Sequence, residues 1–159
     1  MEIPITIRQA TLSDLDEMLA IEEANFSSEE AVSRQSIEEC IRKSAGTFLV
    51  ARDENQLVGY VLGALVSETH TQALLNLEIK RLAIHPDHRG QGLGTLLLAT
   101  LKQVAVEEGV KCLRLTCPDD FLSYFEMNGF VEEEVTESQY DSGPCWYLTW
   151  ANPFYQEEI

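Results

Sequence analysis

The chain has 159 residues, of which 45% are hydrophobic and 24% charged, which is the size and composition of one globular domain and excludes a disordered chain. Its 27 acidic and 11 basic residues give a net charge of −16, which would repel nucleic acid and anionic membranes and argues against both as partners. The four cysteines lack the spacing of zinc ligands, and no segment approaches the roughly 18 uninterrupted apolar residues of a membrane span, so we expect a single domain over residues 1–159, cytoplasmic, with reduced thiols and no metal.

The first third of the chain predicts a strand followed by two helices. Ile5–Arg8 alternates apolar and polar residues as a strand does. Thr11, with Asp14 three residues later, resembles a capping box that opens a helix. A second helix is predicted over Glu29–Lys43. The apolar face of the first helix would consist of Leu12, Leu15, Met18 and Leu19.

The middle of the chain predicts three strands and a long helix. The strands span Thr47–Ala51, Leu57–Val66 and Leu74–His85, and a polar turn joins the first two as a hairpin. Gly92–Glu108 carries leucines at helical spacing, and Gly109 would end this helix as a C-terminal cap.

The last third predicts a strand over Cys112–Thr116, a short helix over Phe121–Asn128, and a closing pair of strands. These two strands span Phe130–Thr136 and Cys145–Trp150, around a Gly143-Pro144 turn. The resulting order, βααβββαβαββ, predicts an α/β (α+β) fold with one mixed sheet and helices packed on it.

The most informative segment leads from the apolar strand Leu82–Ile84 through a proline turn into Arg89-Gly90-Gln91-Gly92-Leu93-Gly94. Glycines let the backbone approach a phosphate, and the unpaired amides of a first helical turn suit an anion. Arg89 would add a charge-assisted contact. A basic patch in the same ten positions fits an anionic ligand, although chance clustering is the alternative; it comprises Lys80, Arg81, His85, His88 and Arg89.

Two common phosphate motifs do not fit this segment. A dinucleotide fingerprint that begins at Gly90 would need glycine where Thr95 stands, and the chain has no G-x-x-x-x-G-K-S/T sequence. The remaining alternative to a phosphate site is that the glycines only permit a tight turn between strand and helix.

Arg89–Gly94 matches the Q/R-x-x-G-x-G/A signature of the GNAT superfamily of N-acetyltransferases, and three further blocks resemble that superfamily in the same order. These blocks are Ile7-Arg8-Gln9-Ala10-Thr11 with Asp14, Leu82-Ala83-Ile84-His85-Pro86, and Ser123-Tyr124-Phe125-Glu126-Met127-Asn128-Gly129-Phe130. The narrower similarity is to bacterial relatives of arylalkylamine N-acetyltransferases, at Glu22–Phe26, Leu115–Asp120, and Ser138–Gly143 with Trp146-Tyr147. The resemblance implies a single GNAT-like domain whose mixed sheet is mostly antiparallel.

The resemblance also implies acetyl-CoA as the co-substrate. Its pyrophosphate would be held by the amides of Arg89, Gly90, Gln91, Gly92, Leu93, Gly94 and Thr95. The backbone of Leu82, Ala83 and Ile84 would pair with the pantetheine arm, beside a bulge that the fold usually carries near Leu82.

Glu78 is the candidate general base, because it stands four residues before Leu82, where histone-type relatives carry a catalytic glutamate. The alternative is a solvated strand carboxylate paired with Lys80 or Arg81. Lys80 stands where the arylalkylamine enzymes carry a second histidine, so their proton relay does not transfer to this chain.

Tyr124 is the candidate general acid, because Phe125 occupies the position of the tyrosine that usually protonates the departing thiolate. Neighbouring side chains on a helix point about 100° apart, so Tyr124 takes over this role only if the helix is rotated or irregular. The alternative is that Tyr124 is a packing aromatic. Four further aromatics, which either flank the acceptor or close the sheet, are Phe26, Tyr140, Trp146 and Tyr147.

The predicted activity is transfer of an acetyl group from acetyl-CoA to a primary amine of a small molecule that resembles an arylalkylamine or a polyamine. A protein N-acetyltransferase would share every cofactor feature. A non-catalytic acyl-CoA-binding module is the third alternative, which Phe125 in the acid position favours. The resemblance further implies a homodimer formed through the late strands.

Overall fold

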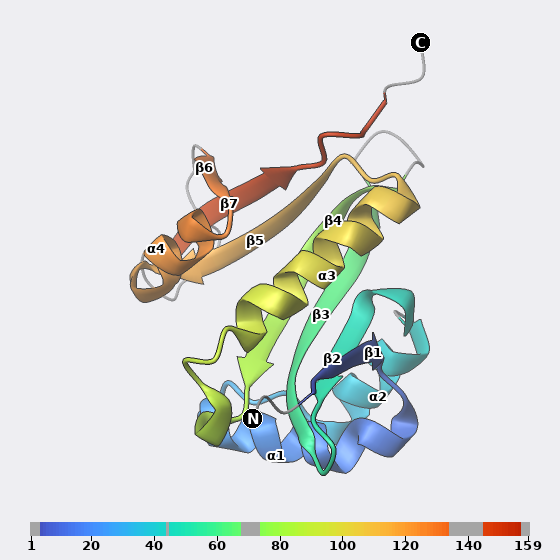
Figure 1. Cartoon of the computed structure of the whole chain (residues 1–159), viewed down its shortest axis with the longest axis vertical. Coiled ribbons are helices and arrows are strands. Elements are labelled where there is room, and N and C mark those ends of the chain that lie inside the picture. Colours follow the sequence, from blue (N-terminus) through green and yellow to red (C-terminus); the bar gives the residue numbers. More distant parts are fainter. Residues whose placement is uncertain (1–3, 44, 68–73, 134–144, 157–159) are drawn as a thin grey trace. The chain divides into compact units, whose positions relative to one another are not determined.

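The computed structural model describes residues 4–43, 45–67, 74–133 and 145–156, and its elements follow the predicted order βααβββαβαββ (Figure 1). The strands are β1 (Thr6–Gln9), β2 (Phe48–Arg52), β3 (Leu57–Ser67), β4 (Leu74–Ile84), β5 (Cys112–Pro118), β6 (Val131–Glu133) and β7 (Cys145–Ala151). The helices are α1 (Leu15–Asn25), α2 (Arg34–Lys43), α3 (Leu93–Glu108) and α4 (Asp119–Met127), with short 3₁₀ helices η1 (Leu12–Asp14), η2 (Ala45–Thr47) and η3 (Pro86–His88).

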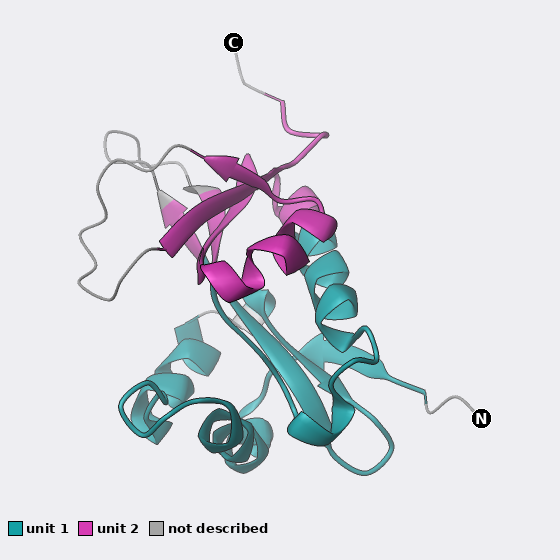
Figure 2. Cartoon of the chain, turned by 90° about the vertical axis from the view of Figure 1, so that its left-hand side faces the viewer, with its two compact units in different colours: residues 1–64, 80–104 teal, residues 65–79, 105–159 magenta. Residues whose placement is uncertain are grey.

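The strands form one seven-stranded sheet in the order β1-β2-β3-β4-β5-β7-β6. Strands β4 and β5 pair in parallel, while β1/β2, β2/β3, β5/β7 and β6/β7 pair antiparallel. The expected mixed, mostly antiparallel sheet with flanking helices is therefore confirmed. The chain divides into two compact units, residues 1–64 with 80–104 (unit 1) and residues 65–79 with 105–159 (unit 2) (Figure 2).

Unit 1 buries strand β3 on both faces. Gly59 faces α3, because a Cβ added there would lie 3.5 Å from Leu97 Cδ1. The next residue, Tyr60, points the other way and donates its hydroxyl to Glu22 of α1. Helices α1 and α2 thus cover one side of the strands of unit 1 and α3 covers the other (Figure 2). The apolar residues that the two sides bury exclude water from the centre of unit 1.

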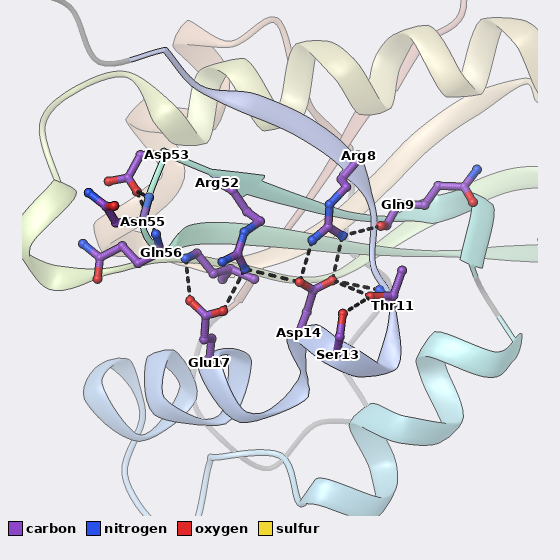
Figure 3. A network of polar contacts seen from close by, with 11 residues as sticks. Arg8, Gln9, Thr11, Ser13, Asp14, Glu17, Arg52, Asp53, Asn55 and Gln56 are labelled. Atoms are coloured by element: carbon purple, nitrogen blue, oxygen red, sulfur yellow. Dashed lines mark hydrogen bonds and ion pairs between the residues drawn. The ribbon is translucent and has the colours of Figure 1, made fainter.

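A network of ion pairs joins β1, α1 and β2 within unit 1 (Figure 3). The buried carboxylate of Asp14 accepts two hydrogen bonds of 2.8 Å from the Arg8 guanidinium and one of 2.9 Å from the Thr11 amide. Arg52 donates to Asp14 at 3.3 Å and to Glu17 at 2.8 Å. Burial alone would raise the pKa of Asp14, but Arg8 and the Thr11 amide outweigh it and hold the pKa below its ordinary value.

Unit 2 carries an apolar layer on one face of its strands. Leu77 of β4 lies in register with Leu113 of β5, and Leu115 of β5 with Leu148 of β7, and all four side chains are buried. Helix α4 adds Phe125, which is buried and packs on Phe130 with ring centroids 5.8 Å apart. These residues form the apolar layer of unit 2.

Helix α1 begins at Leu15, whereas the predicted apolar face of the first helix began at Leu12. The Thr11–Asp14 pair opens η1 and not α1, so Leu12 lies outside the helix and is 47% exposed. The second helix begins at Arg34 rather than Glu29. The Ser33 hydroxyl accepts a hydrogen bond of 3.2 Å from the Ser36 amide, which is the contact of an N-cap.

The strand and helix boundaries of the last third also differ slightly from prediction. Helix α4 begins at Asp119, with Pro118 in extended conformation before it, two residues earlier than expected. Strand β6 is described only over Val131–Glu133, and the predicted Gly143-Pro144 turn lies outside the described residues.

Candidate active site

The glycine-rich segment forms an open turn at the start of α3 in unit 1. Gly90 and Gly92 have φ of +79° and +77°, a conformation that glycine adopts at little cost. The Gly92 carbonyl accepts the Leu96 amide at 3.0 Å, so Gly92 caps the helix. A Cβ added at either glycine would meet no other atom within 4 Å. The turn therefore leaves open space beside the unpaired amides of a 16-residue helix, where an anion is favoured.

Arg89 at the head of this turn is bound to α1. Its guanidinium donates to the side-chain oxygen of Asn25. The amide nitrogen of Asn25 donates to the Ile21 carbonyl at 2.8 Å and to the Ile84 carbonyl at 3.1 Å. Asn25 thus links the helix end, the last residue of β4 and the arginine of the turn. No local sequence pattern marks Asn25 as a site residue, because its partners Arg89 and Ile84 are distant in the sequence.

The end of β4 is held tightly against β3. The His85 amide donates to the Val58 carbonyl at 2.8 Å. A Cβ on Gly59 would lie only 2.8 Å from Ile84 Cδ1 and 3.0 Å from the Ala83 carbonyl oxygen. Gly59 therefore permits the close approach that positions the backbone of Leu82, Ala83 and Ile84.

Arg81 serves a buried cluster instead of the predicted anion patch. Its guanidinium donates to the Glu22 carboxylate at 3.0 and 2.8 Å and to the Glu30 carbonyl at 2.6 Å. Burial would raise the pKa of Glu22, but Arg81, Tyr60 and the Val32 amide outweigh it and lower that pKa. For Tyr60, burial and the neighbouring Glu22 both raise the pKa. The prediction that Arg81 forms part of an anion-binding patch was therefore wrong, because its guanidinium is bound to Glu22.

Glu78 lies in unit 2, on the face of the sheet opposite its apolar layer. Its Cα partner in the parallel β4/β5 pairing is Arg114, whose own partner on β7 is Thr149. Glu78 is half-buried and Arg114 is exposed. The register thus places a cation beside the candidate base, a neighbour that no local sequence pattern predicts because Arg114 is 36 residues away.

Tyr124 also lies in unit 2, on α4. It is half-buried, and its ring centroid is 5.2 Å from that of Phe125. Phe125 is the aromatic that packs into the apolar layer, so the two neighbours point in different directions as expected for a helix.

Two of the other candidate aromatics, Phe26 and Trp146, contact charged side chains of the protein itself. Arg81 lies 3.7 Å from the ring centroid of Phe26, a cation–π contact that occupies one face of the ring. The Trp146 indole donates to Asp119 at 2.5 Å. Tyr147 is half-buried on β7, and Tyr140 lies outside the described residues.

The described parts of the chain contain no group of three or more His, Cys, Asp or Glu side chains arranged to hold a metal. None of the described helices is long and apolar enough to cross a membrane.

The chain is similar to known proteins in sequence and in fold. Over 64 residues the chain is 36% identical to N-acetyltransferase 8F1 of Rattus norvegicus, a match that spans 40% of this chain and 28% of that protein. The fold is similar to that of Ard1 from Thermoplasma volcanium, with a TM-score of 0.76 and 20% identity over 91% of this chain and 95% of that one. It is equally similar to the PaiA N-acetyltransferase of Thermoplasma acidophilum in complex with coenzyme A, with a TM-score of 0.76 and 19% identity over 94% of this chain and 99% of that one.

The model of the Acetyltransferase (GNAT) family matches residues 13–130, which include the first helix, the glycine-rich turn and α4. Since this match covers most of the chain, the protein belongs to the Acetyltransferase (GNAT) family.

Proposed function

We propose that the chain is a single-domain, acetyl-CoA-dependent N-acetyltransferase that moves an acetyl group to the primary amine of a small molecule. The observation that carries this proposal is the turn of Gly90 and Gly92, which opens α3 with positive φ angles and free space beside its amides. Family membership supports the same chemistry. The proposal places the enzyme in the cytoplasm and includes a homodimer formed through the late strands.

The residues of unit 1 fit the cofactor. The amides from Arg89 to Thr95 would hold the pyrophosphate, because the first turn of a helix offers unpaired N–H groups and a positive dipole end. The backbone of Leu82, Ala83 and Ile84 would pair with the pantetheine arm, and the Ile84 carbonyl would share its lone pairs with Asn25. Acetyl-CoA, when bound, supplies an activated thioester to the reaction.

Glu78 would act as the general base. An alkylamine is mostly protonated at neutral pH, so it must lose a proton before it becomes a nucleophile. Glu78 would accept this proton directly or through a water molecule. Arg114 is the Cα partner of Glu78 in the parallel β4/β5 pairing.

Tyr124 would act as the general acid, giving its hydroxyl proton to the sulfur of the departing thiolate. Phe125 has no proton to give and packs in the apolar layer, which leaves Tyr124 as the phenol of this helix. Its half-buried position on α4 is consistent with access to a ligand.

The test is release of free CoA from acetyl-CoA over a panel of primary amines, with acetyl-CoA binding measured by calorimetry. Amine-dependent release with saturation by both substrates supports the proposal. Tight binding of acetyl-CoA without acetylation of any amine would establish the non-catalytic acyl-CoA-binding module instead. Acetylation of peptide amines alone would establish a protein N-acetyltransferase.

A further inference from the structure

The segment between α1 and α2, residues 26–33, contacts strand β4 through one buried ion pair. Glu22 of α1 is 1% exposed, and its two carboxylate oxygens accept hydrogen bonds from the Arg81 guanidinium at 3.0 and 2.8 Å. The same guanidinium donates to the Glu30 carbonyl at 2.6 Å, and the Val32 amide donates to Glu22 at 3.1 Å. Each member of the pair therefore contacts the backbone of the segment.

The first residue of this segment contacts the same arginine. The guanidinium carbon of Arg81 lies 3.7 Å from the centroid of the Phe26 ring, which is a cation–π contact. Residues 27–30 are exposed, so their side chains bury little apolar surface that could fix the segment in place. The contacts that Phe26, Glu30 and Val32 make with the ion pair therefore set where this exposed part lies.

The segment also contributes to the wall of a pocket of about 340 Å³ in unit 1. The lining of this pocket includes Glu22, Val32, Ile37, Cys40 and Arg81. Concave sites of this size, with mainly apolar walls and a few polar groups, are the usual binding places of small ligands. The ion pair thus fixes the position of a pocket wall in addition to joining two elements of the fold.

The pocket adjoins the part of β4 that is assigned to the cofactor. Arg81, which lines the pocket, directly precedes Leu82, the first of the three residues proposed to pair with the pantetheine arm. An acceptor in the pocket would therefore lie beside the strand along which the thioester arm runs. The wall that contains Val32 would then determine how the amine is presented to the thioester.

We propose that Glu22 is a positioning residue for the acceptor, an inference that rests on the proposed function. Glu22 acts through Arg81 and through the Val32 amide. The ion pair holds residues 26–33 against β4, and the segment held in this way orients the amine. Small errors in the orientation of a substrate cost large factors in rate, so the loss of Glu22 lowers kcat/KM for the amine.

The last turn of α1 thereby serves both substrates. Asn25, three residues after Glu22, donates to the Ile84 carbonyl at 3.1 Å and accepts from the Arg89 guanidinium. Its contacts thus lie in the segments assigned to the cofactor, whereas Glu22 contacts the segment assigned to the acceptor. Substitutions at these two positions should therefore change KM for different substrates.

The first test compares Glu22→Gln with Asp14→Asn in steady-state kinetics over a panel of primary amines. Both carboxylates are 1% exposed, and both accept two hydrogen bonds from an arginine at 2.8 to 3.0 Å. Both substitutions break a buried ion pair and should destabilise the fold. Glu22→Gln should lower kcat/KM for the amines about 10- to 100-fold without changing KM for acetyl-CoA. Asp14→Asn should change neither value.

The second test separates positioning from stability. Tyr60 also donates to Glu22, so the triple variant Glu22→Leu, Tyr60→Phe, Arg81→Met replaces the whole polar cluster by apolar side chains. Such replacements are often neutral or stabilising, but the segment loses its two backbone contacts. We expect urea unfolding to recover toward wild type while kcat/KM for the amines stays as low as in Glu22→Gln. Recovery of both quantities together would show that Glu22 only supports the fold.

The third test follows the segment without turnover. Backbone hydrogen exchange of residues 26–33 is measured by mass spectrometry with free CoA, in the presence and absence of phenethylamine. Phenethylamine should slow this exchange severalfold in wild type and in Asp14→Asn. In Glu22→Gln the Val32 amide should exchange faster than in wild type, because it loses its charged acceptor, and phenethylamine should have no effect.

Two kinetic results would overturn the inference: equal losses of kcat/KM in Glu22→Gln and Asp14→Asn, or a rise in KM for acetyl-CoA alone in Glu22→Gln. If no amine is acetylated but phenethylamine slows exchange of residues 26–33 only in proteins that retain Glu22, the proposed function fails and the segment remains a Glu22-dependent binding site. If wild type and Glu22→Gln acetylate amines equally well, the function stands and this inference fails.

Discussion

Asn25 at the end of α1 accepts a hydrogen bond from the Arg89 guanidinium and, through its amide nitrogen, donates to the Ile84 carbonyl at 3.1 Å. One side chain therefore holds both the arginine of the proposed phosphate turn and the last residue of the strand proposed to pair with pantetheine. This arrangement makes Asn25 a positioning residue for the cofactor, although it lies 64 residues before Arg89.

Replacing Asn25 should weaken acetyl-CoA binding selectively. In Asn25→Ala the guanidinium loses its acceptor, a hydrogen bond to a charged group worth about 1.5–3 kcal/mol. We expect KM for acetyl-CoA to rise about tenfold while KM for the amine is unchanged. Asn25→Asp, which keeps the acceptor for Arg89, should recover part of the loss. Equal effects on both KM values would show that Asn25 only supports the fold.

Gly59 should tolerate no side chain. In Gly59→Ala the new Cβ would lie 3.0 Å from the Ala83 carbonyl oxygen, a backbone atom that moves only if β4 moves. We expect the free energy of unfolding to fall by about 1–3 kcal/mol and acetyl-CoA binding to weaken. Gly46→Ala is the control, because a Cβ there meets nothing within 4 Å. Urea unfolding that gives equal losses for both variants would contradict this packing argument.

The expected effect of Glu78→Gln is a loss of two to four powers of ten in kcat/KM for alkylamines, because the variant cannot accept a proton. The loss should shrink for amines that are already neutral at the assay pH, since these need no base. Glu132→Gln, on an exposed residue of β6, is the control. A uniform loss for all amines would show that Glu78 does not act as the base.

Tyr124→Phe removes the proposed acid without changing the shape of the ring. We expect kcat to fall by about two powers of ten with KM for acetyl-CoA unchanged. Tyr155→Phe, on another half-buried tyrosine, should have no effect. A kcat within a factor of about two of wild type would make Tyr124 a packing aromatic and leave protonation of the thiolate to water.

Asp14 should make the fold sensitive to acid. Because its pKa is lower in the folded chain than the ordinary value of about 4, its contribution to stability is complete above that pH. The contribution is lost as the pH falls through the lowered pKa of the folded state. Urea unfolding between about pH 6 and pH 3 should show a steeper loss for wild type than for Asp14→Asn. Parallel curves of unfolding free energy against pH for the two proteins would contradict the proposed linkage. The pKa of Glu22 is also lowered, so both proteins should keep some loss of stability in acid.

Local signals in the sequence predicted the order of elements well. The glycines at 92 and 109 bound α3, and Gly109 adopts the positive φ that is typical of a C-terminal cap. Thr11 and Asp14 form the expected contact, although it opens η1. These features depend on neighbours within a few residues, which a sequence pattern records directly.

The contacts that shape the candidate site join residues that are far apart in the sequence. Glu22 and Arg81 are 59 residues apart, and no periodicity shows that they form a buried pair. The local clustering of basic residues therefore predicted an anion patch that includes Arg81, whereas Arg81 pairs with Glu22. Asn25, Gly59 and Arg114 were overlooked for the same reason, because their partners lie on other elements.

The most direct measurement of the central claim is the fate of a carbon-13-labelled acetyl group supplied as acetyl-CoA with phenethylamine and followed by mass spectrometry. The account predicts labelled N-acetylphenethylamine and an equal amount of free CoA, both dependent on the enzyme and on the amine. Bound acetyl-CoA that never labels an amine, in this panel or on a peptide, would contradict the claim and identify the chain as an acyl-CoA-binding protein.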